Sequence, residues 1–177
     1  KGFGKHEDAP ATDRGLNLPL HRQDASLMKW IGANSYRTAH YPYAEEALDI
    51  ADREGFLIID EIPAVGLSFN DGEENIRKRL DQCKQQVSEL IARDKNHPSV
   101  IAWSVANEPI PNNMGGLVAL EESDSGIDES GGNAFFDELF AHTRAIDDSR
   151  PVILVGVMGG SPTAWLEHSD FIAINRY

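Results

Sequence analysis

The sequence contains few residues that could cross-link the chain and no long apolar run that could anchor it in a membrane. Cys83 is the only cysteine among 177 residues, so an internal disulfide and a cysteine-based zinc site are both excluded. No apolar run approaches the roughly 20 residues of a membrane span. Basic residues are scarce as well, because 16 Lys and Arg stand against 29 Asp and Glu without any basic run. We therefore expect neither nucleic acid nor a membrane as a partner.

Common cofactor motifs are also missing. The glycines at 156–160 lack the Lys-Ser/Thr of a phosphate loop and the Gly-x-Gly-x-x-Gly of a dinucleotide fold. No His-x-x-x-His pair supports a metal site, and the acids at 124–129 do not match EF-hand spacing. We expect no metal and no organic cofactor. A targeting segment is not apparent, so the compartment stays open, with the bacterial cytoplasm or periplasm expected.

What the sequence does contain is an alternation of buried strands and amphipathic helices. Strands are predicted at residues 1–3, 34–38, 56–59, 152–155 and 171–174, and in the apolar run that ends before Asn107. Between them lie five predicted helices, the first capped by Asp24 and the third carrying Cys83 on its apolar face. Residues 109–132 are predicted to be a surface loop. Six strands alternating with five helices indicate a parallel α/β sheet.

Polar side chains follow nearly every predicted strand, which favours a barrel over a doubly wound sheet, although the latter stays open. A TIM barrel has about eight βα units and roughly 250 residues. Six strands therefore predict a (β/α)8 barrel truncated at its C-terminus, with residues 1–177 as a partial catalytic domain. The carboxyl ends of barrel strands meet at one face, so these polar groups should lie together. They are residues 5–8, Arg37 with His40, residues 60–61, residues 107–108 and residues 175–177.

Glu108 is the candidate around which this polar face is organised. It follows a strand predicted to be buried on both faces, and Pro109 ends the strand by removing a hydrogen-bond donor. Hydrolysis of a glycosidic bond needs one carboxyl group as acid and a second about 5–5.5 Å away for retention or about 6.5–9.5 Å away for inversion. We predict Glu108 as the acid, kept protonated by apolar neighbours, and Asn107 as a ligand of the adjacent sugar hydroxyl.

Simpler interpretations of the same residues stay open. The second carboxylate is Glu61 or a residue beyond Tyr177, and residues 60–61 are alternatively ion-pair partners of Arg37. His6 and His40 are alternatively core or solvated histidines, or ligands of a metal held with carboxylates. His97 precedes a proline before its strand begins and is predicted to be a turn residue far from the site.

Five segments, in order along the chain, resemble the TIM-barrel catalytic domain of glycoside hydrolase family 2, and within it the bacterial members that act on β-glucuronides. They are residues 4–8 (GKHED), 32–42 (GANSYRTAHYP), 59–61 (IDE), 96–109 (NHPSV through NEP) and 175–177 (NRY). The resemblance implies retaining hydrolysis of β-D-glucuronides, with Glu108 as acid/base and Asn107 on the 2-hydroxyl group. It further implies that Arg37 and Tyr177 orient the nucleophile. Substrate-binding roles are implied for His6, Asp8, His40 and Asn175.

The resemblance also implies parts that this chain does not contain. The family has two β-sandwich domains before the residue that corresponds to Lys1, and its nucleophilic glutamate lies on a strand beyond Tyr177. We therefore expect the activity in the parent enzyme, a homo-oligomer that takes a small-molecule or oligosaccharide glycoside, and almost none in the isolated chain. A β-galactosidase of the same family and a non-catalytic carbohydrate-binding module are the alternatives.

Overall fold

Six strands form one parallel sheet in the computed structural model, which describes residues 1–9, 13–111, 130–157 and 161–176. In spatial order the strands are β1 (Gly2–Lys5), β4 (Ser35–Thr38), β5 (Leu57–Glu61), β6 (Val100–Asn107), β7 (Val152–Val157) and β8 (Ala173–Asn175). A small antiparallel pair, β2 (Asp8–Ala9) with β3 (Asp13–Arg14), lies outside this sheet and was not predicted.

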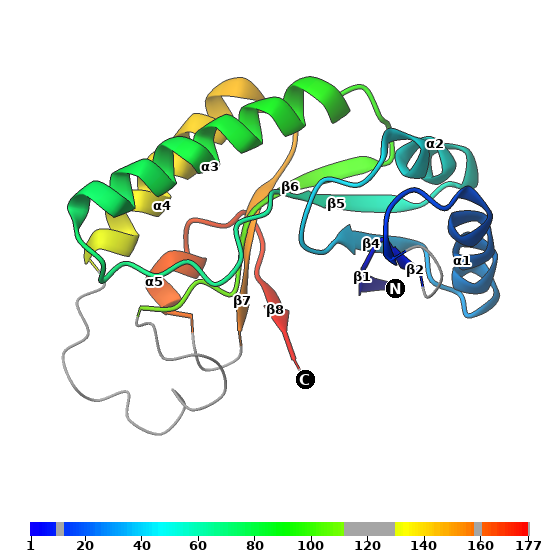
Figure 1. Cartoon of the computed structure of the whole chain (residues 1–177), viewed down its shortest axis with the longest axis horizontal. Helices are drawn as coiled ribbons and strands as arrows, with labels where there is room; N and C mark the ends of the chain where they lie inside the picture. The colour runs from blue at the N-terminus through cyan, green and yellow to red at the C-terminus, as the bar shows by residue number, and fades with distance from the viewer. Residues whose placement is uncertain (10–12, 112–129, 158–160, 177) are drawn as a thin grey trace.

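The order of the strands decides between the two predicted architectures. Each strand of the sheet pairs with the next one along the chain, and every pairing is parallel. A doubly wound sheet would reverse its strand order at a switch point, whereas a barrel winds in one direction only. Figure 1 shows the result as an arch, with the large helices on its outer side and strands β4 to β8 beneath them. The prediction of an α/β barrel topology is confirmed, with six strands in the sheet of the described residues.

Five helices connect the strands in the described chain. They are α1 (Leu18–Trp30), α2 (Glu45–Glu54), α3 (Glu73–Asp94), α4 (Ser130–Ile146) and the short α5 (Thr163–Leu166). The predicted start of α1 was wrong, because Asn17 is the cap and its Oδ1 accepts from the Leu20 N–H at 3.1 Å. Asp24 lies within the helix instead, where it pairs with Lys5 at 2.9 Å.

The core fills the layer between the sheet and the outer helices. Trp103 of β6 and Trp165 of α5 are both completely buried there. Phe69 contacts the Trp165 ring edge-on, with a centroid separation of 4.9 Å. Cys83 is buried in the same layer, and burial raises the pKa of its thiol to about 11, so its predicted role in core packing is confirmed. Burying each such large side chain stabilises the fold by roughly 1.5–3 kcal/mol.

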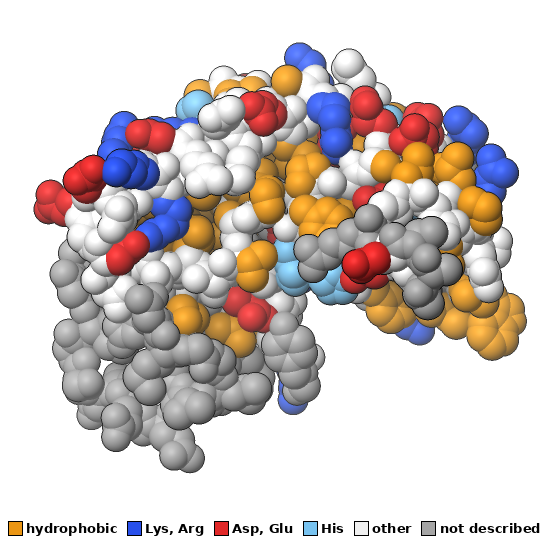
Figure 2. Space-filling model, viewed as in Figure 1, with side chains coloured by type: hydrophobic (Ala, Val, Ile, Leu, Met, Phe, Trp, Pro, Cys, Tyr) orange, Lys and Arg blue, Asp and Glu red, His pale blue; other side chains and the backbone are white. Residues whose placement is uncertain are grey.

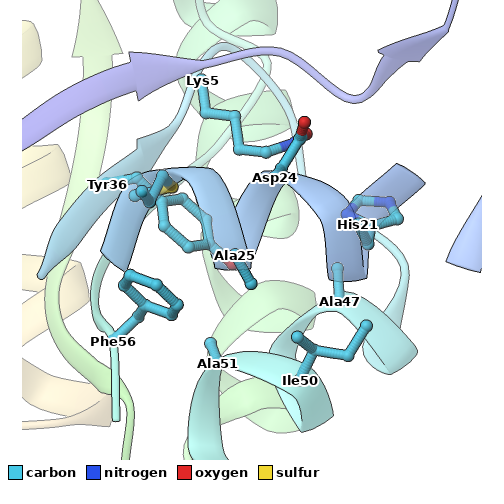
Figure 3. Close-up of a pocket in the computed structure, with 10 residues that line it drawn as sticks. Lys5, His21, Asp24, Ala25, Tyr36, Ala47, Ile50, Ala51 and Phe56 are labelled. Atoms are coloured by element: carbon cyan, nitrogen blue, oxygen red, sulfur yellow. The ribbon is translucent and has the colours of Figure 1, made fainter. Parts of the chain in front are cut away.

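Helices α1 and α2 pack at the end of the sheet formed by β1 and β4, with little space between the two helices. The cavity between them has a volume of about 10 Å³, which is room for about one water molecule. In Figure 3 the rings of Tyr36 and Phe56 lie at one end of it, while Lys5 and Asp24 reach toward each other above it. A larger, mostly apolar groove of about 470 Å³ lies between β1 and α1, lined in part by Trp30, whose side chain is 83% exposed.

Two further predictions concern the helices and the loop after β6. In the part of the chain that the structure describes, no helix combines the length and apolar character of a membrane span. Most of the loop predicted at 109–132 lies outside the described residues, and α4 already begins at Ser130.

Candidate active site

Four predicted site residues stand at the carboxyl ends of their strands. Arg37 is the third residue of β4, Asn107 ends β6, Glu108 follows it directly, and Asn175 ends β8. Glu61, the last residue of β5, joins them. Because all of these strands are parallel and adjacent in order, their ends converge on the same edge of the sheet. These five residues, together with His40, are called the Arg37 cluster below.

The guanidinium group of Arg37 is the hub of this cluster. Its Nη1 donates to both carboxylate oxygens of Glu61, at 2.6 and 2.7 Å, and to Asn107 Oδ1 at 3.1 Å. Its Nη2 donates to Asn175 Oδ1 at 3.0 Å. Arg37 thus connects the ends of β5, β6 and β8. Of residues 60–61, the predicted alternative ion-pair partners of Arg37, Glu61 is confirmed, whereas the prediction is wrong for Asp60, which accepts from Thr38 instead. Ser104 Oγ donates to Glu61 Oε2 at 2.7 Å and completes the surroundings of that buried carboxylate.

Asn107 is held in one orientation by two donors. Its Oδ1 accepts from Arg37 Nη1 and from Asn175 Nδ2, the latter at 3.0 Å. A guanidinium group can only donate, so the oxygen of the amide must face Arg37 and the NH2 group must take the other branch. Asn107 is almost fully buried, and its main-chain N–H and C=O bond to Ala64 and Gly66 at 2.8 Å each. The amide therefore presents a fixed donor to whatever occupies the strand ends.

Glu108 leaves the strand in an unusual conformation. Its φ is +51°, a left-handed value that side-chain-bearing residues adopt at a cost of about 1–3 kcal/mol. The surrounding contacts hold it there, since its N–H donates to Val155 O at 2.7 Å and its Oε1 accepts from Asn175 Nδ2 at 2.7 Å. The side chain is half-buried at the edge of the sheet. Backbone strain concentrates where a side chain must be aimed for function.

The two histidines at this edge lie against each other. His40 Nδ1 is 2.8 Å from Glu61 Oε1, and the His6 and His40 rings meet nearly edge-on with centroids 5.4 Å apart. His40 is therefore part of the cluster, whereas the exposed His6 borders it. Figure 2 shows histidine side chains gathered near the middle of one face of the molecule.

The loop that carries His6 is anchored by Glu7, which sequence reasoning did not single out. The Glu7 carboxylate lies 3.0 Å from His21 Nε2 of α1 and accepts from the Ala44 N–H at the start of α2. Asp8, a predicted binding residue, accepts from the Tyr41 hydroxyl at 3.4 Å and lies outside the Arg37 cluster. Tyr177, also predicted, falls outside the described residues. Ser104 was missed too, although a lone serine within a run of buried apolar residues was the available signal.

His97 lies at the opposite end of its strand, so its predicted role as a turn residue away from the site is confirmed. It forms, with Asp49 and Asp52, the one group of described residues that are spaced like metal ligands. The two oxygens of Asp52 already accept from Ser99 N at 2.9 Å and contact His97 Nδ1 at 2.6 Å. Although burial opposes it, hydrogen bonds from Ser99 and His97 lower the pKa of Asp52. Asp52 of α2 therefore stabilises the turn before β6, and these contacts of Asp52 with His97 and Ser99 are called the Asp52 clamp below.

Comparison with known proteins defines the class of this domain. All residues from 1 to 177 match the family model described as "Glycosyl hydrolases family 2, TIM barrel domain". The chain therefore belongs to glycosyl hydrolase family 2, in agreement with the barrel topology and with polar groups collected at the carboxyl ends of its strands.

Individual relatives narrow the comparison further. The chain is 40% identical over 185 residues to a β-glucuronidase of Paenibacillus borealis and 39% identical over 177 residues to that of Rattus norvegicus. Both alignments include the whole of this chain, but they cover only 28% and 24% of the length of these relatives, which is about a quarter.

The solved structures that resemble this chain are also β-glucuronidases. The apo β-glucuronidase of Ruminococcus gnavus matches with a TM-score of 0.83 and 40% identity, over 100% of this chain and 29% of that one. The Bifidobacterium dentium β-glucuronidase complexed with coumarin-3-O-glucuronide matches with a TM-score of 0.83 and 38% identity, over 99% and 26%.

Proposed function

We propose that the protein containing this chain hydrolyses β-D-glucuronides with retention of anomeric configuration, using Glu108 as general acid/base. The observation that carries the proposal is the strained, hydrogen-bonded placement of Glu108 beside the fixed amide of Asn107. The sugar assignment is supported by relatives at about 40% identity that are β-glucuronidases, one of them solved with a coumarin glucuronide.

In the first step of this reaction the Glu108 carboxyl donates its proton to the glycosidic oxygen while a carboxylate attacks the anomeric carbon. The bond from that carbon to the leaving oxygen breaks, and a covalent glycosyl-enzyme forms. In the second step the Glu108 carboxylate takes a proton from water, whose oxygen attacks the same carbon and releases the nucleophile. Two carboxyl groups suffice for both steps, so the reaction requires neither metal nor cofactor.

The attacking carboxylate is proposed to come from a residue outside 1–177. Glu61 is the only other carboxylate in the Arg37 cluster as the structure describes it, and both of its oxygens accept from Arg37. A fully buried carboxylate committed to an ion pair is a poor nucleophile, so Glu61 is better suited to hold Arg37 in place. Arg37 and Tyr177 would then orient the incoming nucleophile, and the isolated chain would be nearly inactive.

Sugar binding is assigned to the side chains around the cluster. The Asn107 NH2 group would donate to the 2-hydroxyl group, next to the reacting carbon. His6, Asp8, His40 and Asn175 would contact the remaining hydroxyl groups, since imidazole, carboxylate and amide groups together supply both donors and acceptors. Asn175 would have a second task, because its Nδ2 already holds Glu108 Oε1.

The test uses the full-length protein with 4-nitrophenyl β-D-glucuronide and the matching β-D-galactoside. Glu108→Gln should lower glucuronide turnover by about 10²–10⁴-fold, whereas Glu46→Gln, a change at an exposed acid of α2, should not. Proton NMR of the first-formed sugar should show the β-anomer. Unchanged turnover in Glu108→Gln would reject the acid/base role and favour a non-catalytic module, and turnover of the galactoside alone would identify a β-galactosidase.

A further inference from the structure

Next to Glu61 the structure holds another buried carboxyl group that the proposed reaction does not use. Asp60 of β5 is completely buried, as is Asp94, the last residue of α3. Asp60 Oδ1 accepts from Thr38 Oγ1 at 2.9 Å, but no N–H or O–H group of the described residues donates to Oδ2. A buried carboxylate oxygen without a donor is costly, because it has lost its hydration without gaining a hydrogen bond. Either this cost is borne or Oδ2 is itself the donor.

Asp94 decides between these possibilities. Its carboxyl group neighbours that of Asp60, and two ionised carboxylates side by side in a fully buried site would contain only acceptors and would repel each other, so one of them carries a proton. Both Asp94 oxygens already accept from Arg93, Oδ1 from Nε at 2.7 Å and Oδ2 from Nη2 at 2.6 Å. Such a bidentate ion pair stabilises the charged form of Asp94. The shared proton therefore belongs to Asp60.

The charges around Asp60 agree with this placement. Helix α3 contributes Asp94 and Arg93, and strand β4 contributes Thr38 and the phenol of Tyr36. The β6 residue in register with Asp60 is the uncharged Trp103, and the adjacent Glu61 is neutralised by Arg37. With one proton on Asp60, the group of Asp60, Asp94 and Arg93 has no net charge. Burial raises the pKa of Asp60 well above its usual range, and the neighbouring Asp94 raises it further.

The same hydrogen bonds reach the candidate active site. Pairing between β4 and β5 ends at Arg37 and Ile59, two residues before Glu61. Beyond that point the Glu61 N–H donates to Thr38 Oγ1 at 2.9 Å, so a side-chain oxygen replaces the missing main-chain acceptor. Thr38 has one hydroxyl proton and gives it to Asp60, which leaves a lone pair aimed at Glu61. Asp60 thereby fixes the residue that holds Arg37.

We propose that Asp60 is a neutral carboxylic acid that donates to Asp94 and, through Thr38, acts as a positioning residue for Glu61 and the Arg37 cluster. The positioning role rests on the proposed glycosidase function. The protonation state does not, because it follows from the burial and partners of Asp60 alone.

The test compares the same chemical change at two neighbouring acids in the full-length protein. Asp60→Asn preserves both hydrogen bonds, since its NH2 group donates to Asp94 and its oxygen accepts from Thr38. It should keep glucuronide kcat/KM within about twofold of the unmodified protein, whereas Asp60→Ala should lower it by about tenfold or more. Asp94→Asn, the matched control, removes the counter-charge of Arg93 and should lower the unfolding midpoint clearly at pH 7.

The protonation state is read from the pH dependence of unfolding. A raised folded pKa means that the folded state binds more protons than the unfolded state, so the contribution of Asp60 to stability falls as pH rises above about 4. Asparagine does not titrate, so Asp60→Asn should not lose this stability. Its unfolding midpoint, compared with that of the unmodified protein at the same pH, should therefore rise as the pH is raised from about 4 to about 8. The infrared difference spectrum between the unmodified protein and Asp60→Asn at neutral pH should show a band of a protonated carboxyl group, because any contribution of Glu108 is common to both proteins and cancels.

Several outcomes would overturn the proposal. Equal destabilisation by Asp60→Asn and Asp94→Asn, or absence of the infrared band, rejects the neutral acid. Full kcat/KM in Asp60→Ala rejects the positioning role. If the full-length protein hydrolyses no glucuronide, the proposed function fails, while the infrared and stability measurements still decide the proton on Asp60.

Discussion

Arg37 Nη1 donates to both carboxylate oxygens of Glu61, at 2.6 Å from Oε1 and 2.7 Å from Oε2, at a place where Glu61 has no exposed surface. Desolvating two charges is expensive, and their mutual attraction offsets that cost only when the geometry is good and the remaining lone pairs are satisfied. Ser104 and His40 supply those additional contacts. The pair therefore forms a rigid base on which Asn107 and Asn175 are oriented.

Removing one member of this pair should be strongly destabilising. Glu61→Gln would leave Arg37, whose side chain is only 10% exposed, without its counter-charge, and a loss of about 3–5 kcal/mol is expected. Arg37→Met should cost a similar amount for the converse reason. Chemical denaturation of the double variant should show a loss well below the sum of the two single losses. Simple additivity would mean that the two charges do not stabilise each other.

Asn175 should affect catalysis through Glu108. Its Nδ2 donates to Glu108 Oε1 at 2.7 Å, and Asn175→Ala removes that contact. Glu108 becomes a carboxylate as its proton leaves in the first step, and a hydrogen bond to a charged group contributes about 1.5–3 kcal/mol, so glucuronide kcat/KM should fall by about tenfold or more. The neighbouring Ile174→Ala, at a side chain that is 49% exposed, is the control and should leave kcat/KM nearly unchanged. Equal effects of the two variants would count against the assigned role of Asn175.

The Asp52 clamp should act on stability and depend on pH. The lowered pKa of Asp52 means that its contribution is present above about pH 4 and is lost as pH falls below that value. Asp52→Asn should therefore cost about 1–3 kcal/mol at pH 7 and progressively less in acid. Asp49→Asn, at an exposed acid on the same helix, should stay within about 0.5 kcal/mol. Thermal unfolding across pH separates them, and a pH-independent cost would contradict the stabilising role of the ionised Asp52 carboxylate.

Two adjacent glycines of α4 should respond in opposite directions to the same substitution. A Cβ at Gly132 would meet the Trp165 ring at 2.1 Å, a severe clash inside the core, whereas one at Gly131 would find its nearest neighbour at 3.5 Å, an ordinary contact. Alanine favours a helix over glycine by up to about 1 kcal/mol. Gly131→Ala should therefore raise the unfolding temperature slightly, while Gly132→Ala should lower it by several degrees. A stabilising Gly132→Ala would show that α5 shifts to make room.

The elements of the fold were largely predictable because strand and helix periodicity are local properties of a chain. Buried runs such as the one before Asn107 and the helix carrying Cys83 are unambiguous at that level. The start of α1 was not, although Asn17 and Pro19 are both helix-start signals, because the side chains that this helix buries, His21, Ala25 and Met28, form no continuous apolar pattern. The short β2 and β3 strands depend on pairing with each other rather than on their own composition.

Sequence by itself determined which chemical groups follow each strand, and the parallel alternation implied that these groups share one edge of the sheet. Only the tertiary structure decided their partners: Glu61 faces Arg37, whereas its neighbour Asp60 contacts Asp94 on α3. The physical reason is that burial and hydrogen-bond geometry arise where segments distant in the chain meet, as for Arg37 and Asn175, 138 residues apart. A carboxylate becomes an ion-pair partner, a neutral acid or a proton donor according to those neighbours, which local sequence does not specify.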